Sequence, residues 1–197
     1  VGNIDFVLTA ADQRMDALQT DVAKALKLPK DTSLAYAVWT IKQKANGDIR
    51  MMVADERPIL ALGDDAPKDA REAAGLLNEG TQEVAVMARD LARLPARMNE
   101  LVMKSKQAKI DTKSLVMAGV DATQKDAIQG KVTANQQTTS ATGERAQTAA
   151  ERAQGLIQAV REGMSATEAP AGGPPVEAAP EPKPEPPAPK PEPAPPP

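Results

Sequence analysis

The stretch "APKDAREAAGLLNEGTQEVAVMARDLARLPARMNELVMKSK" (66–106) decides the fold of this chain of 197 residues. Its apolar residues are spaced alternately three and four apart for four and a half heptads. This spacing predicts one long amphipathic helix that packs along a single seam. Pro67 stands where a first-turn proline is well tolerated. The seam residues are Ala70, Ala73, Leu77, Gly80, Val84, Met87, Leu91, Leu94, Met98 and Leu101.

Pro95 lies inside this predicted helix. A proline in a helix interior removes one backbone hydrogen bond, clashes with the preceding turn and costs about 3 kcal/mol. The apolar spacing nevertheless continues without a break on both sides of it. We therefore predict a kinked helix and not a domain boundary at this position.

A second long helix is predicted over 115–163, joined to the first by a short polar connection, so that the two form an antiparallel hairpin. The tetrapeptide "ERAQ" recurs here after seven residues, at 144–147 and 151–154. At about 25 cal/mol per Å² of buried apolar surface, a seam of small residues stabilises less than one of Leu, Met and Val. We therefore expect this helix to depend on a partner helix. Its seam is Ile128, Val132, Asn135, Thr139, Thr142, Ala146, Ala149, Ala153, Leu156 and Val160.

The first segment, 3–29, predicts a third helix of the bundle, which Pro29 ends. Its apolar residues again follow a heptad pattern for about three repeats. They are Ile4, Leu8, Ala11, Met15, Leu18, Val22 and Ala25.

The segment that follows predicts a short helix, 33–45, capped by Asp31 or Thr32 and stopped at Asn46-Gly47. After it, 48–54 and 58–62 predict a β-hairpin, with Pro58 tolerated at a strand start. The alternative is a hairpin across "ANGD" (45–48), because Asn-Gly is a strong hairpin signal. Two strands alone are marginal, so the hairpin is expected to lie against helices.

The chain is thus predicted to be mainly α, an elongated helical hairpin or coiled-coil-like bundle with a small β-hairpin at about 48–62 and a disordered Pro-rich C-terminal tail. We divide it into four parts. These are an N-terminal amphipathic helix (1–30), a helix plus β-hairpin (31–65), a long helical hairpin (66–164) and a disordered Pro/Glu/Lys-rich tail (165–197).

The composition excludes many kinds of site. The chain has no histidine and no cysteine, which removes Ser-His and Cys-His pairs, Cys/His zinc sites and iron–sulfur clusters. The pair Asp64–Asp65 is interpreted as a helix cap and not as a cation site. No catalytic, cofactor-binding or metal-binding residue is predicted, and the protein is expected not to be an enzyme.

Charge and aromatic content argue against nucleic acid as a partner. The net charge of −3 resides in the segment from Ser165 onward, which carries five glutamates against two lysines, so the body is neutral. The three aromatic residues all lie within the first forty positions and offer no stacking platform for bases. No apolar run approaches the roughly 20 residues that span a bilayer.

The C-terminal segment "EAAPEPKPEPPAPKPEPAPPP" (177–197) is similar in composition to the Pro-Glu-Pro-Lys spacers of TonB-like periplasm-spanning proteins. That resemblance implies a semi-rigid polyproline spacer and a place in the bacterial cell envelope or periplasm. Within residues 1–197 we expect neither a membrane helix before the segment nor a folded domain after it, and this departs from the pattern of that family. A signal sequence or membrane anchor upstream of Val1 is part of this hypothesis.

Three functions stay open at this point. The first is a non-enzymatic structural or adaptor protein of the envelope that binds protein partners, or itself, through heptad-patterned helices. The second is a cytoplasmic coiled-coil binding module of the granule-coating or cytoskeletal-adaptor type. The third is a small binding domain within 33–63, reported by Trp39, on a helical stalk. The eight methionines are interpreted as core residues of an aromatic-poor bundle.

Overall fold

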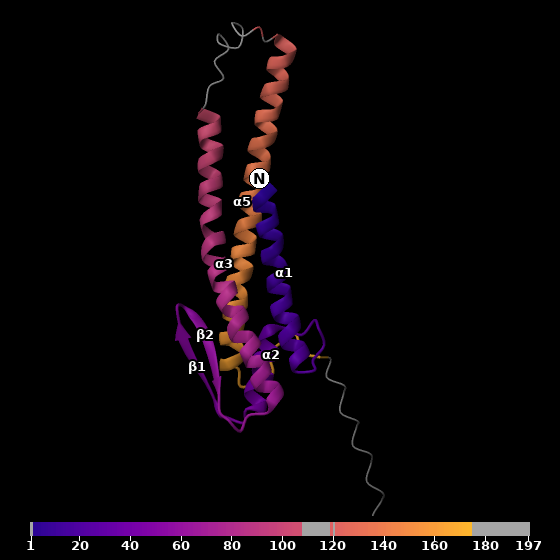
Figure 1. The fold of residues 1–197 in the computed structure, drawn as a ribbon, viewed down its shortest axis with the longest axis vertical. Helices are drawn as coiled ribbons and strands as arrows, with labels where there is room; N and C mark the ends of the chain where they lie inside the picture. The colour runs from indigo at the N-terminus through magenta and orange to yellow at the C-terminus, as the bar shows by residue number, and fades with distance from the viewer. Residues whose placement is uncertain (1, 108–118, 120, 175–197) are drawn as a thin grey trace, which may run out of the picture.

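A computed structural model describes residues 2–107, 119 and 121–174. The predicted mainly helical architecture with one two-stranded sheet is confirmed (Figure 1). The long helices α3 and α5 run antiparallel, α1 lies along the lower part of this pair, and α2 and the hairpin lie at its base. The elements are α1 (Gly2–Ala25), α2 (Leu34–Lys44), β1 (Ile49–Ala54), β2 (Arg57–Leu62), α3 (Lys68–Gln107) and α5 (Ala122–Ser165).

Helix α1 buries the seam that its heptad spacing predicts. Leu8, Ala11, Met15, Leu18 and Val22 are all at most 6% exposed. The helix ends before Pro29 because Lys27 adopts a left-handed conformation, with φ of 58°. The Leu28 N–H then donates to the Ala23 carbonyl at 2.9 Å, the bond that closes a Schellman motif.

Helix α2 is capped one or two residues later than predicted. The N-cap is Ser33, and not Asp31 or Thr32: Ser33 has extended backbone angles, and its side chain accepts a hydrogen bond from the Tyr36 N–H at 3.2 Å. Thr32 is buried, 2% exposed, but its hydroxyl makes no hydrogen bond to the first turn of α2. The predicted end of the helix is confirmed, since Asn46 and Gly47 both have positive φ.

The hairpin forms as predicted, and the "ANGD" alternative is wrong because 34–44 is helical. Asp55 and Glu56 form its two-residue turn, and both have positive φ. A turn with this backbone conformation matches the right-handed twist of the two strands that it connects. Pro58 lies opposite Val53 at a position where the strands exchange no hydrogen bonds, so its missing N–H removes nothing from the ladder.

Asn78 of α3 closes the outer edge of β2. Its side-chain amide accepts from the Leu60 N–H and donates to the Leu60 carbonyl, both at 2.8 Å. The amide therefore stands in for a neighbouring strand. Leu60 and Pro58 are buried on the α3 side of the hairpin, as a marginal two-stranded sheet requires.

Helix α3 is the centre of the bundle and is continuous through Pro95, whose predicted kink stays a prediction. Its predicted seam is buried or half-buried from Ala70 to Met98, but Leu101 is 54% exposed, so the prediction was wrong there. A second stripe, which the heptad pattern missed, is also buried. Its residues are Ala74, Thr81, Ala85 and Ala88.

Helix α5 starts at Ala122, with Asp121 and Gln124 forming a reciprocal capping box. The predicted start at 115 and most of the predicted polar connection lie outside the described residues. The predicted seam is buried at Thr142, at Val160 and at the alanines between them, while Ile128 is 36% exposed. The two helices lie close together at Gly143, where an added Cβ would lie 3.2 Å from the Met98 Cβ and 3.8 Å from the Pro95 Cα.

The segment after α5 returns across α2. The Ser33 N–H donates to the Gly172 carbonyl at 2.8 Å, and the Ser33 hydroxyl donates to the Ala171 carbonyl at 2.7 Å. The Lys42 ammonium donates to the carbonyls of Met164 and Ala166, each at 2.8 Å, where a cation suits a helix C-terminus. Part of the predicted disordered tail, 166–174, is therefore placed, and hydrogen bonds at Ala166, Ala171 and Gly172 join it to α2 and its cap, while 175–197 lie outside the described residues.

Candidate protein-binding grooves beside α3

Helix α3 is flanked by two surface grooves. The first, which we call the apolar groove, lies between α1 and α3 and has a volume of about 430 Å³. The second, the turn groove, lies between α3, α5 and the hairpin turn and has a volume of about 770 Å³. Helix α3 contacts both α1 and α5, and each groove lies along one of these two contacts.

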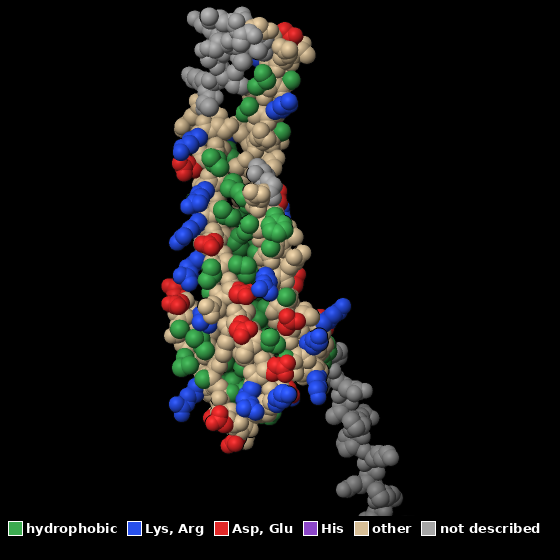
Figure 2. Space-filling view, in the orientation of Figure 1, with side chains coloured by type: hydrophobic (Ala, Val, Ile, Leu, Met, Phe, Trp, Pro, Cys, Tyr) green, Lys and Arg blue, Asp and Glu red, His purple; other side chains and the backbone are tan. Residues whose placement is uncertain are grey.

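The apolar groove has a hydrophobic wall that solvent reaches. Phe6, the one phenylalanine of the chain, is 75% exposed, and Val7 is 51% exposed. On α3 they face Met87 and Leu94, which are half-buried. Figure 2 shows hydrophobic side chains in a band that runs between the long helices past the start of α1. Two exposed apolar side chains beside two half-covered ones form a contact face that the described residues leave open.

Charged side chains rim the apolar groove. Three arginines, Arg14, Arg93 and Arg97, and one acid, Asp90, line it. Arg14 pairs with Glu83 at 3.2 Å and Arg93 approaches Asp90 at 4.0 Å, both on the surface. Such exposed pairs are weak, worth about 0–1 kcal/mol, so the arginines can exchange these partners for a carboxylate of another protein.

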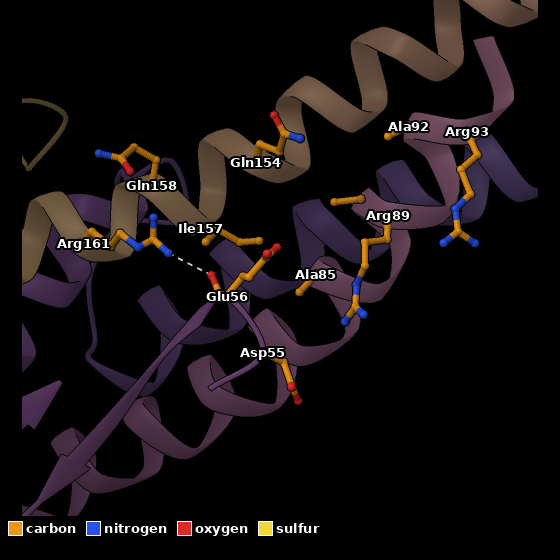
Figure 3. A pocket seen from close by; sticks show the side chains of 11 residues that line it. Asp55, Glu56, Ala85, Arg89, Ala92, Arg93, Gln154, Ile157, Gln158 and Arg161 are labelled. Carbon is orange, nitrogen blue, oxygen red and sulfur yellow. Dashed lines mark hydrogen bonds between the residues drawn. The ribbon is translucent and has the colours of Figure 1, made fainter. Parts of the chain in front are cut away.

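The turn groove is more polar. The Arg161 guanidinium donates to the Glu56 carbonyl at 2.8 Å and joins α5 to the hairpin turn, while the Glu56 side chain extends toward Ile157 (Figure 3). The floor is made by Ala85 and Ala88 of the second stripe of α3. Acids and arginines share this groove, so its charges largely balance, and we regard it as the weaker of the two contact faces.

A set of ion pairs, which we call the ionic ladder, joins α1 to α5. Arg145 contacts Asp5 at 2.5 Å, and one heptad later Arg152 contacts Asp12 at 3.2 Å and also Asp16. The hydrogen bond that Arg152 donates to the Asp16 carboxylate raises the pKa of Arg152, and the bond that it donates to Asp12 adds to the shift. The recurring "ERAQ" thus places one arginine per heptad against α1, and these two helices run parallel.

No described residues form a group of three or more acidic, His or Cys side chains that could hold a metal ion. Asp64 and Asp65, considered above as a pair, lie in the turn that precedes α3. None of the helices in the described ranges is long and apolar enough to cross a membrane. The residues that line the two grooves offer apolar contact, hydrogen bonding and charge pairing.

The methionine interpretation holds only in part. Met15 and Met98 are buried, and Met87 and Met164 are half-buried. Met51, Met52 and Met103 are exposed, which contradicts the interpretation for them, and Met117 lies outside the described residues.

The two grooves were not predicted, although the sequence held one signal. Phe6 and Val7 flank the predicted seam at Ile4 and Leu8, so the spacing alone places both on the solvent side of α1. An apolar pair at such positions is a candidate contact surface.

Comparisons with protein-family models, with curated proteins and with solved structures each gave no match.

Proposed function

We propose that this chain is a non-catalytic adaptor that binds a helix of another protein in the apolar groove. The observation that carries the proposal is the exposure of Phe6 and Val7 beside Leu94, in a groove formed by two helices that are themselves fixed to a common core. Helix-in-groove recognition requires such a preformed apolar face with anchors spaced along it.

The rim selects the chemistry of the partner. Three arginines against one aspartate favour a helix that carries apolar anchors on one face and carboxylates beside them. Rim charges of this kind mainly raise the association rate and orient the partner, while buried apolar anchors supply most of the affinity.

We place this adaptor in the bacterial cell envelope, with the Pro-rich C-terminal segment as a spacer between the helical body and its surroundings. The composition of that segment supports the location. Fractionation of the source cells tests it, and recovery of the protein in the cytoplasmic fraction alone would contradict the location without affecting the groove.

Photo-crosslinking tests the groove. A benzophenone amino acid replaces Phe6 in the full chain, and the same substitution at Val86 is the matched control, because Val86 is an exposed apolar residue, 49% exposed, that lines neither groove. In the source cells, position 6 should give a discrete adduct whose linked peptide is an apolar and acidic helical segment. Position 86 should give none.

Two further variants make the result quantitative. Leu94→Asp should abolish the adduct at position 6, because it puts a charge into the apolar wall. Arg97→Glu should weaken binding of the identified segment by about tenfold, with less effect at high salt. If position 6 gives no more adduct than position 86, the proposed function is wrong.

A further inference from the structure

The outer edge of β1 is unpaired in the described structure. The sheet has two strands, and β1 pairs only with β2 (Figure 1). Bonded and non-bonded residue pairs alternate along an antiparallel ladder. Leu60 turns its N–H and carbonyl outward to Asn78, so its cross-strand neighbour Met51 also turns its polar groups away from β2. By the same alternation, Ile49 and Val53 do so too.

The inner face of β1 is also uncovered. Met51 and Val53 lie opposite Leu60 and Pro58, and cross-strand neighbours project from the same face of a sheet. Leu60 and Pro58 are buried against α3, but Met51 is 36% exposed and Val53 62% exposed. The strand therefore presents free backbone groups at its edge and apolar side chains on the face that a wider sheet would bury.

We propose that β1 pairs with β1 of a second copy of this chain, antiparallel about a two-fold axis at Met51, to form one four-stranded sheet. The inference is independent of the proposed function, since the apolar groove lies on other elements. An antiparallel partner strand lets Ile49, Met51 and Val53 bond in turn to Val53, Met51 and Ile49 of the copy, with two hydrogen bonds per pair. All three pairs are apolar.

The neighbouring registers are less favourable. A two-fold axis at Arg50 would set like charges directly opposite each other, which destabilises a sheet. An axis at Met52 would pair Ile49 with Asp55 of the copy, whose turn conformation, with φ of 49°, is not that of a strand. With the axis at Met51, Arg50 instead faces Met52 of the copy.

A second copy of β1 is a better occupant of this edge than the Pro-rich segment of the same chain. Figure 1 shows β1 at the side of the molecule with no described element beyond it. The Pro-rich segment of this chain is a poor occupant, because proline has no N–H to donate to the carbonyls of the edge. A second β1 supplies both donors and acceptors at every bonded position.

Cysteine cross-linking tests the register, and the native chain has no cysteine to interfere. Arg50→Cys and Met52→Cys chains, one of them carrying a mass tag, are mixed and oxidised. In the proposed register these positions face each other as a non-bonded pair about 4.5 Å apart between Cα atoms. The mixed disulfide should therefore form faster than a disulfide between two copies of the same variant. Preferred linkage of either variant to itself, or no preference, would overturn the proposed register.

The oligomeric state tests the pairing itself. Sedimentation equilibrium of the full chain should show a concentration-dependent rise from 20.7 kDa toward twice that mass. Met51→Pro removes the outward N–H without touching the bonds to β2, as Pro58 already does on the other strand, and should weaken association by about tenfold or more. Met51→Val keeps the N–H and should still dimerise.

Met51→Lys is a second variant that tests the pairing without a proline, in case Met51→Pro misfolds the hairpin. It places two ammonium groups together at the two-fold axis, on a side chain that solvent already reaches, so association should weaken at low salt and recover at high salt. A native chain that stays at the monomer mass, or variants that associate as well as the native chain, would overturn the proposal.

Discussion

The two long helices keep the same heptad spacing but bury different amounts of surface. Helix α3 buries Leu77, Val84, Leu91 and Met98 among its seam residues. Helix α5 buries mainly alanines, and all of its buried residues lie between Thr142 and Gly163, where α1 and α2 lie beside it. The difference shows that heptad spacing predicts which face turns inward, while side-chain size and the number of neighbouring helices decide how much that face stabilises.

The largest expected contrast is between matched truncations on the two helices. Leu77→Ala and Ile128→Ala each remove three carbons, but Leu77 is 1% exposed and Ile128 is 36% exposed. The first should lower the free energy of unfolding by about 2–5 kcal/mol, and the second by less than about 1 kcal/mol. Urea titration followed by circular dichroism measures both. Equal losses would mean that the first turns of α5 are buried in solution.

Two glycines on α5 give the next contrast, because replacing each by alanine should change the stability of the protein in opposite directions. A Cβ at Gly163 would meet the carbonyl oxygen of Ala35 and the side chain of Val38, whereas nothing lies within 4 Å of a Cβ at Gly155. Gly163→Ala should destabilise by about 1–3 kcal/mol through overpacking. Gly155→Ala should stabilise by about 0.5–1 kcal/mol through helix propensity. The thermal unfolding midpoints of both variants measure these changes. Midpoints that shift in the same direction would refute the close approach of α5 to α2.

Much of the fold could be predicted because its signals are local. The two Leu/Met/Val seams and the hairpin follow from the spacing of apolar residues and from turn residues, and Pro58 fits since its position needs no N–H. The Ser33 cap was missed because Asp31, Thr32 and Ser33 are consecutive residues that all favour an N-cap, so their identities alone do not select one of them. The second stripe of α3 was missed because alanines carry little pattern, although a neighbouring helix can bury them.

The candidate groove could be predicted less well than the fold. Its walls come from α1 and α3, which are far apart in sequence, and no spacing rule states which residues of two helices will be left uncovered. The C-terminal segment shows the same limit. The bonds of Ser33 to Ala171 and Gly172 join positions nearly 140 residues apart, and nothing in the local composition at 166–174 predicts them.

The ionic ladder allows a test of whether ion pairs add stability to α5, whose seam of small residues buries little apolar surface. Arg152→Ala removes contacts to both Asp12 and Asp16, while Gln147→Ala removes only a bond within α5, to Glu151. Because the ion pairs of Arg152 are partly exposed, Arg152→Ala should lower the free energy of unfolding by about 0.5–1 kcal/mol, and this loss should be smaller at high salt. Urea titrations at low and high salt measure it. A loss that does not depend on salt would assign the effect of Arg152 to packing.

The smallest expected effect is a pH dependence of the stability of the protein, through Asp69 in the first turn of α3. A hydrogen bond from Lys44 lowers the pKa of Asp69, and the two groups are 2.6 Å apart. A carboxyl whose pKa is lower in the folded state contributes stability above its unfolded pKa of about 3.9 and loses it as pH falls through the folded pKa. Both side chains are partly exposed, so this contribution is about 0–1 kcal/mol.

Lys44→Met should remove that contribution, so the stability difference between the native chain and the variant should narrow below about pH 4 and stay constant from about pH 6 to 8. With no histidine in the chain, no imidazole titrates in the upper range. Urea midpoints across the two ranges measure the difference. A difference that widens as pH falls would show that Lys44 acts through another group, and a step between pH 6 and 8 would reveal a strongly shifted carboxyl or lysine in the body.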